Sequence, residues 1–243
     1  ETKIIISETK HKMLEHRMKL DGFDPLVISN KNFGKTKIVL TVNGDDEIEG
    51  DTGCLIVHDN LSIANMNDCG IDKNQIDIIK QNCPNGHPTV ALLTYAGAGP
   101  YPQTYYFENS EERKIAEQKK HDQFLKMYSD YCELLEPTRA MPFAGSYVLG
   151  GPLSKHNSHR GVADAVEVLQ LEKCGDISFV LDDGGDAIFD LETLVANKLR
   201  TKPYSYEEIQ NYQSQDETHV HSRWGIHCAT LDTVRDSIYE SYC

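Results

Sequence analysis

Residues 55–69, LIVHDNLSIANMNDC, run from a hydrophobic stretch into a carboxylate, Asp68. The apolar residues up to Met66 predict a buried strand, and a carboxylate held at the tip of a strand is suited to bind a metal ion or to act in catalysis. Aspartate is also a common turn and helix-capping residue, and a helix is expected from Asp72 onwards. A ligand and a turn or cap residue are therefore both open interpretations of Asp68.

Histidines form the second set of candidate ligands. His156 and His159 lie in SKHNSHRGVADAV, directly before an expected helix. Neutral imidazole is a common ligand of transition metals, but a loop histidine also commonly packs on the start of a helix. Nearer the C-terminus, His219 and His221 are spaced so that a strand would place both on one face, with His227 following. No cysteine or carboxylate cluster accompanies them, which favours surface or core histidines beside Trp224.

The third candidate feature is an aromatic loop, YAGAGPYPQTYYF, at residues 95–107. Its glycines allow sharp turns, and its tyrosines could form a wall that stacks on a substrate and donates hydrogen bonds. The same side chains could instead anchor a long loop to the core. The residues concerned are Tyr95, Tyr101, Tyr105 and Tyr106.

The sequence lacks the motifs of several other kinds of binding or catalytic site. The acidic stretch LDDGGDAIFD lacks the spacing of an EF-hand and predicts a hairpin turn. GGPLSK is not a phosphate-binding P-loop, and neither G-x-S-x-G nor a Cys/His nucleophile pair stands out.

Composition restricts the partners. The 243-residue chain has a formal net charge of −14, with 39% hydrophobic and 26% charged residues. Its lysines and arginines are mixed with acids, which disfavours nucleic-acid binding, and no run of about 18 apolar residues predicts a membrane span. Seven cysteines without a C-x-x-C motif favour a reducing compartment, so we expect a cytoplasmic protein. The expected partner is a small-molecule substrate, in keeping with the aromatic loop as a substrate wall.

The order of elements predicts an α/β fold with a mixed sheet and outer helices. A strand and a helix that Ser7 could cap precede several short strands. We then expect a helix over 72–83, a buried strand over 89–96 and a long helix from Ser110 to before Pro137. A strand over 138–145, a helix over 158–175, a hairpin over 177–191 and a helix over 205–217 complete the prediction.

Three segments together resemble the metallo-β-lactamase fold. They are DTGCLIVHDNLSIANMNDC, LLTYAGAGPYPQTYYF before a long helix, and LEPTRAMPFAGSYVLGG after it. The wording is most similar to the branch that contains the CMP-N-acetylneuraminate hydroxylases and the phospholipase-D-like and lactonase-like relatives. The resemblance covers residues 3–170 and rests on the order of the motifs.

The resemblance implies an αββα sandwich and hydrolysis by a metal-bound hydroxide. It implies a divalent transition metal, zinc or iron, in a mononuclear or dinuclear site. Asp68 would bridge two metal ions, and His159, with His156 as a near alternative, would complete one metal's ligands.

The family's H-x-H-x-D-H signature is missing, however. The nearest string, HVHSRWGIH, has Arg223 where the aspartate is expected and lies at the wrong end of the chain. We therefore expect this chain to be the second half of the fold, with a half-domain over 1–175, an extension over 176–243, and the N-terminal half as a partner. Two alternatives stay open: hydroxylation of a sugar-nucleotide or similar small molecule, and a non-catalytic binding module that lost the metal loop.

Overall fold

The computed structural model describes residues 3–43, 51–97, 99–145, 147, 149, 156–189, 193–205 and 207–208. The chain divides into two compact units. The first comprises Glu1–Tyr147 and His159–Pro203, and the second comprises Val148–Ser158 and Tyr204–Cys243. The domain boundary that we predicted between residues 175 and 176 falls inside the first unit.

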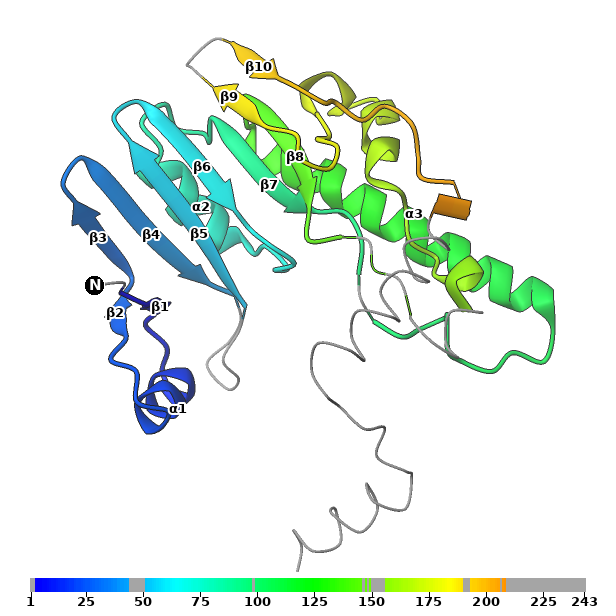
Figure 1. Cartoon of the computed structure of the whole chain (residues 1–243), viewed down its shortest axis with the longest axis horizontal. Coiled ribbons are helices and arrows are strands. Elements are labelled where there is room, and N and C mark those ends of the chain that lie inside the picture. Colours follow the sequence, from blue (N-terminus) through cyan, green and yellow to red (C-terminus); the bar gives the residue numbers. More distant parts are fainter. Residues whose placement is uncertain are drawn as a thin grey trace, which may run out of the picture. The chain divides into compact units, whose positions relative to one another are not determined.

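A six-stranded mixed sheet forms the centre of the first unit, which confirms the predicted α/β class (Figure 1). The first four strands pair antiparallel, and the last three are parallel to one another. In spatial order they are β3 (Asn30–Phe33), β4 (Thr36–Val42), β5 (Thr52–His58), β6 (Leu61–Asn65), β7 (Val90–Thr94) and β8 (Arg139–Phe143).

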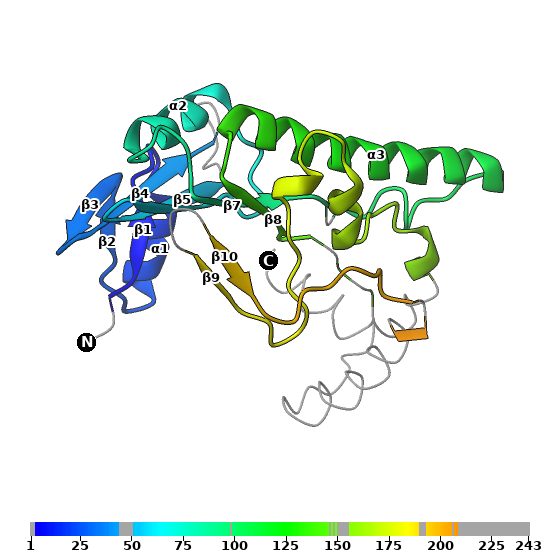
Figure 2. The ribbon, with the colours of Figure 1, turned by 90° about the horizontal axis from the view of Figure 1, so that it is seen from above.

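Helices α2 and α3 cover one face of this sheet (Figure 2). Side chains along a strand point alternately to the two faces of the sheet, which explains why the helices cover this face. Leu55 and Val57 on β5 and Ala64 on β6 are buried beneath the helices. Ile56 and Ile63 point to the other face and are exposed. The buried residues join Ile79 of α2 and other apolar side chains in one core cluster.

Helix α2 (Lys73–Asn82) begins with the capping residue that the sequence predicts. The Asp72 carboxylate accepts a hydrogen bond from the Gln75 backbone N–H at 2.8 Å, and the Asp72 N–H donates to the Gln75 side chain at 3.2 Å. The buried Gln75 amide also donates to Thr41 Oγ1 on β4, at 3.2 Å. This capping box therefore also fixes α2 against the sheet.

Helix α3 (Ser110–Leu135) has the predicted extent, but Asn109 rather than Ser110 caps it. The Asn109 side chain accepts a hydrogen bond from the Glu112 N–H at 2.8 Å. The helix ends at Glu136, which adopts a left-handed conformation before Pro137. Its buried C-terminal half, which includes Tyr128 and Leu135, packs in the core beside β7.

The helix predicted over 158–175 is wrong. In its place the described residues form only short 3-10 segments: one that includes 156–159, η2 (Ala165–Gln170) and η3 (Gly175–Ile177). Gly161 has φ of +58° and lies against the backbone of α3, where a Cβ atom would come within 2.8 Å of the Glu117 carbonyl oxygen. A regular helix cannot pass through this position, so the helical segment starts later, at the Asp164 cap.

The structure also differs from the prediction of a hairpin over 177–191. Ser178 pairs with Ala140 beside β8, and Leu181 pairs with Leu199. The hairpin is instead formed by β9 (Ala187–Phe189) and β10 (Leu194–Ala196). It lies on the side of the sheet opposite α2 and α3 (Figure 2).

The N-terminal elements are β1 (Ile5–Ser7), α1 (Met13–Leu20) and β2 (Leu26–Ile28), with β1 and β2 parallel. Ser7 ends β1 and does not cap α1, because Lys12 occupies the N-cap position. Helix α1 buries none of its residues.

In the second unit, the Asn157 side chain brackets the backbone of Leu149, accepting from its N–H and donating to its carbonyl oxygen, each at 2.9 Å. His219, His221 and His227, and all of the predicted helix over 205–217 except 205 and 207–208, lie outside the described residues. Among the helices that are described, none combines the length and apolar character needed to cross a membrane.

Candidate functional site

The carboxyl ends of β6, β7 and β8 lie at one edge of the sheet because these strands are parallel. Ligands of open α/β sheets commonly bind at this edge. The turn over 66–69, the loop over 95–107 and residues 144–147 leave the sheet here, and they carry several of the predicted site residues.

Asp68 lies in a turn and does not cap a helix. The Cys69 N–H donates to the Met66 carbonyl oxygen at 2.9 Å, and the Asn67 N–H donates to the Asn65 side chain at 2.9 Å. The Asp68 side chain is exposed and forms no hydrogen bond or ion pair with any described residue. Burial, together with the charges of Asp51 and Asp68, raises the pKa of Cys69 to about 11, so this neighbouring thiol stays protonated at neutral pH.

The predicted aromatic wall is divided among different environments. Tyr95 is buried, and its ring occupies the space where Gly145 has no side chain. Tyr101 packs edge-on against Tyr105, with ring centroids 5.2 Å apart. Tyr106 is 87% exposed and is the only one of these four tyrosines that lines the cavity described next. The structure therefore does not bring the four rings together on one surface.

A cavity of about 320 Å³ lies against the N-terminal turns of α3. This volume is at the lower end of the range for small-molecule sites. Its lining combines two aromatic rings, two cations, a histidine, a carboxylate, an amide and a hydroxyl: Tyr106, Phe107, Asn109, Ser110, Arg113, Lys114, Glu117 and His159. The four helical residues, at positions 110, 113, 114 and 117, follow the 3.6-residue period and so share one face of α3.

The cations of the cavity suit an anionic ligand. The Arg113 Nη2 atom donates to the Tyr105 carbonyl oxygen at 2.9 Å, and its guanidinium lies over the Phe107 ring, 5.4 Å from the centroid. The Arg113 Nε atom is buried and has no hydrogen-bond partner among the described residues. Among the described residues, the ion pair of Lys114 is with exposed Glu111, at 3.5 Å. The positive end of the α3 dipole adds to this field.

The most reactive pair in the cavity is His159 and Glu117. The His159 Nδ1 atom lies 2.9 Å from Glu117 Oε1, with side-chain exposures of 38% and 18%. A carboxylate accepts hydrogen bonds only, so Nδ1 carries the proton and the Nε2 atom of a neutral His159 is left as the basic atom. This arrangement fits a general base whose ring is oriented by a carboxylate.

Arg160 holds the segment that carries His159. Its Nη1 atom donates to the Tyr147 carbonyl oxygen at 2.5 Å. Burial lowers the pKa of Arg160, and the nearby Tyr147, Tyr95 and Asp164 oppose that shift. The Asp164 carboxylate in turn pairs with Arg200 at 2.6 Å.

The described residues do not form a complete metal site. His159 is tied to Glu117 on α3, whereas the segment after Asp68 is tied to α3 through the Ile71 N–H and Tyr131 Oη, 2.9 Å apart. Glu117 and Tyr131 are fourteen residues apart, or about 21 Å along a helix.

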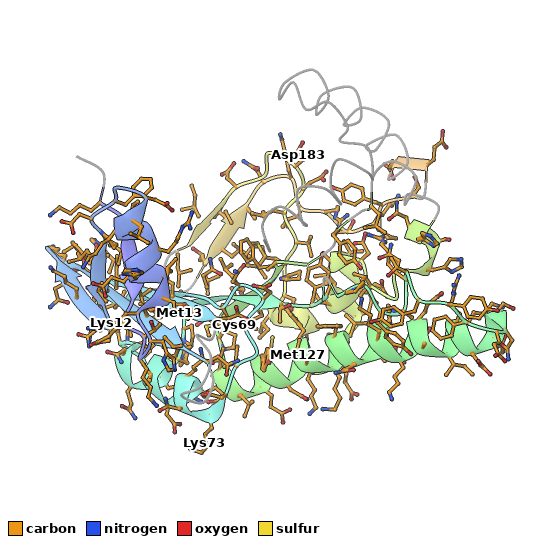
Figure 3. The ribbon with its side chains drawn as sticks, turned by 90° about the horizontal axis from the view of Figure 1, so that it is seen from below. Lys12, Met13, Cys69, Lys73, Met127 and Asp183 are labelled. Atoms are coloured by element: carbon orange, nitrogen blue, oxygen red, sulfur yellow. The ribbon has the colours of Figure 1, made fainter. Side chains whose placement is uncertain are left out.

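No group of three or more His, Cys, Asp or Glu side chains that could hold a metal ion occurs within the described ranges. The acidic turn at Asp183 also lies far from Cys69, the neighbour of Asp68 (Figure 3). His156 is half-buried and belongs to the second unit.

We did not predict a functional role for Arg113, Lys114 and Glu117 from the sequence. Their charges fit the mixed-charge surface expected of a long helix. The signal that was available is their position in the first turns of that helix, directly after the aromatic loop.

No protein-family profile and no curated protein matches the sequence. Among solved structures, the chain is similar to Igni18, a novel metallo hydrolase from the hyperthermophilic archaeon Ignicoccus hospitalis KIN4/I. The TM-score is 0.42 with 16% identity, and the match covers 82% of this chain and 70% of that one.

Two further similar structures are a mutant of the CmlA β-hydroxylase and the metallo-β-lactamase-fold protein YhfI from Bacillus subtilis. For CmlA the TM-score is 0.38 with 13% identity, covering 59% of this chain and 31% of that chain. For YhfI the TM-score is 0.35 with 5% identity, and the match covers 64% of this chain and 59% of that chain. The chain therefore shows structural similarity to metallo-β-lactamase-fold proteins at low identity.

Proposed function

We propose that this chain is a hydrolase of small anionic esters, with its substrate bound in the cavity beside α3. The observation that carries the proposal is the 2.9 Å contact between His159 Nδ1 and Glu117 Oε1 in a cavity that Arg113 and Lys114 also line. The cations bind an anionic group of the substrate, and the rings of Tyr106 and Phe107 contact its apolar part.

In this proposal His159 transfers the protons and Glu117 orients the His159 ring. His159 Nε2 removes a proton from a water molecule as the water oxygen bonds to the ester carbonyl carbon. When the ester bond breaks, the imidazolium returns that proton to the leaving alcohol. Glu117 keeps the ring in the required tautomer and stabilises its positive charge, so Glu117 is a positioning residue.

Mono-4-nitrophenyl glutarate tests this function, because it joins a free carboxylate to an aryl ester whose cleavage is followed by absorbance. The uncharged 4-nitrophenyl butyrate is the matched substrate. We expect a higher kcat/KM for the glutarate, and His159→Gln should lower it by about 100-fold. His58→Gln, which changes an exposed histidine of β5, should leave the rate unchanged. Equal rates for the two histidine variants would refute the proposal.

Arg113→Met tests the anion site separately. Loss of a charged donor should reduce the preference for the glutarate over the butyrate by about tenfold. Lys119→Met removes the same charge from an exposed position of α3 that does not line the cavity. That variant should keep the preference.

Metal-dependent hydrolysis is a second candidate, which one observation favours. The Asp68 carboxylate is exposed at the carboxyl edge of the parallel strands and has no partner among the described residues. We propose that in this case Asp68 supplies one ligand, with the remaining ligands outside the described residues or on a partner chain. Elemental analysis of the full chain after dialysis against Zn²⁺ tests this candidate: Asp68→Asn should lower the metal content and Asp77→Asn should not. An unchanged metal content in Asp68→Asn would remove it.

A further inference from the structure

Two buried cysteines lie together away from the cavity. Cys132 is on α3, and Cys174 immediately precedes η3. Both are free thiols, 4% and 2% exposed, in the same core cluster, and each side chain is close enough to shift the pKa of the other. The pKa of Cys83, the other buried cysteine on a helix flank, is influenced by a serine, Ser62, instead.

Hydrogen bonds of Ser178 and Tyr128 hold the backbone at Cys174 in place. The Ser178 hydroxyl donates to the Cys174 carbonyl oxygen at 2.7 Å, and Tyr128 Oη lies 2.9 Å from the same hydroxyl. Ser178 is itself fixed beside β8 by its pairing with Ala140. The segment around Cys174 is therefore held against the same face of α3 that presents Cys132.

The two sulfur atoms are also chemically different. The interaction with Cys132, helped by Ser129 and Ser178, lowers the pKa of Cys174 against the effect of burial. The interaction with Cys174, together with burial, raises the pKa of Cys132. Thiol oxidation needs a thiolate that attacks and a second thiol that resolves the product, and this pair supplies both.

We propose that Cys132 and Cys174 form a reversible disulfide when the protein meets a peroxide, and that this bond is a redox switch that goes beyond the hydrolytic function. The Cys174 sulfur attacks one peroxide oxygen, which gives a sulfenic acid and releases one water. The Cys132 sulfur then bonds to that sulfur and a second water leaves. Overall, two thiols and one hydrogen peroxide give one disulfide and two waters.

The bond would join the two elements that carry the reactive pair of the cavity. Cys132 follows Glu117 by fifteen residues on α3, and Cys174 follows His159 by fifteen residues on the facing segment. The crosslink would close a loop of 42 residues. It would thereby restrict the separation of α3 from the segment of His159.

The test is oxidation of the folded full chain with hydrogen peroxide, followed by alkylation of the remaining thiols and peptide mapping. Because both sulfurs are buried, we expect the reaction to take minutes to hours rather than seconds, limited by local opening. The expected product is a linked peptide pair containing Cys132 and Cys174, which dithiothreitol separates. The absence of this pair, or its formation only in denaturant, would overturn the proposal.

Variants give a second measurement. The disulfide should raise the Tm of the oxidised protein by about 10 °C. Cys83→Ser, the matched control, should show the same shift, and Cys132→Ser should show none. A shift that persists in Cys132→Ser would assign the effect to other cysteines and overturn the proposal. If Cys132→Ser does not fold, peptide mapping of the oxidised unmodified chain still shows whether the Cys132–Cys174 disulfide forms.

Discussion

The Nδ1 atom of His159 is hydrogen-bonded to the carboxylate of Glu117, which lies 42 residues earlier in the sequence. The contact exists because Gly161 lets the backbone after His159 approach α3 at the level of Glu117. A histidine at the end of a short 3-10 turn and a carboxylate on α3, neither unusual alone, thus become one acid–base pair.

The first prediction concerns Glu117. Glu117→Leu removes the group that orients His159, so we expect kcat for the anionic ester to fall about tenfold or more while KM changes little. The measurement is steady-state kinetics over a range of substrate concentrations. Glu133→Leu, a change at an exposed position of α3 that does not line the cavity, should leave both parameters unchanged. A rise in KM without loss of kcat would show that Glu117 acts in binding instead.

The second prediction concerns the contact between Gly145 and Tyr95. A Cβ atom at Gly145 would lie 1.9 Å from the Tyr95 ring, so Gly145→Ala should lower the free energy of unfolding by about 1–3 kcal/mol. Urea denaturation measures the loss. Gly99→Ala, where a Cβ atom meets no neighbour within 4 Å, is the control. In a Tyr95→Ala background, Gly145→Ala should cost much less, and an equal cost in both backgrounds would contradict the steric explanation.

The third prediction concerns the Asp164–Arg200 ion pair, whose side chains are 19% and 11% exposed. Arg200→Met leaves a largely buried carboxylate without its partner and should destabilise the protein by about 3 kcal/mol. Adding Asp164→Asn, which keeps the hydrogen bond that caps η2, should recover part of the loss. Lys173→Met breaks the exposed pair with Glu133 and should change stability by less than about 1 kcal/mol.

The fourth prediction concerns pH. His121 Nε2 lies 2.9 Å from Glu167 and Nδ1 lies 3.0 Å from Asp122. Burial works to lower the pKa of His121, but the two carboxylates outweigh it and raise the pKa above its ordinary value. Protonated His121 therefore stabilises the fold fully below about pH 6.5, the pKa of an unfolded-state histidine, and this contribution is lost as the pH rises through the higher folded-state pKa.

Urea denaturation across this pH range checks the effect. Between pH values of about 5 and 9, the stability advantage of the unmodified chain over His121→Gln should shrink as the pH rises. His16→Gln, which changes an exposed residue of α1, should show a constant difference. A constant difference for His121→Gln as well would show that its protonation is not coupled to folding.

Sequence patterns predicted the elements whose local signals agree with their packing. Helix α2 began at Asp72 as expected, because its capping box is a local signal, and α3 ended before Pro137 for a similar reason. The patterns failed where distant contacts decide the structure. The helical periodicity after residue 158 was overridden by the approach of Gly161 to α3, and the turn at Asp182–Gly185 leads to a strand pair further along the chain.

The candidate site was predictable only in part. The sequence singled out His159 as a candidate metal ligand, and Tyr106 as part of an aromatic substrate wall. It could not show that Glu117 is the neighbour of His159, because that contact depends on how the segment after β8 returns to α3. The metal-ligand roles of Asp68, His156 and His159 stay predictions, and so does the substrate-wall role of Tyr95, Tyr101, Tyr105 and Tyr106.

The outermost strand β3 has a consequence for self-association. Within the described part of the chain it pairs with β4 alone, and all four of its residues are exposed. Lys31 lies over the Phe33 ring, 5.8 Å from its centroid, so the strand's bulky apolar group carries a charge beside it. Such a charge on a short strand opposes the docking of another molecule's strand, and Lys31 thereby protects the protein against edge-to-edge polymerisation.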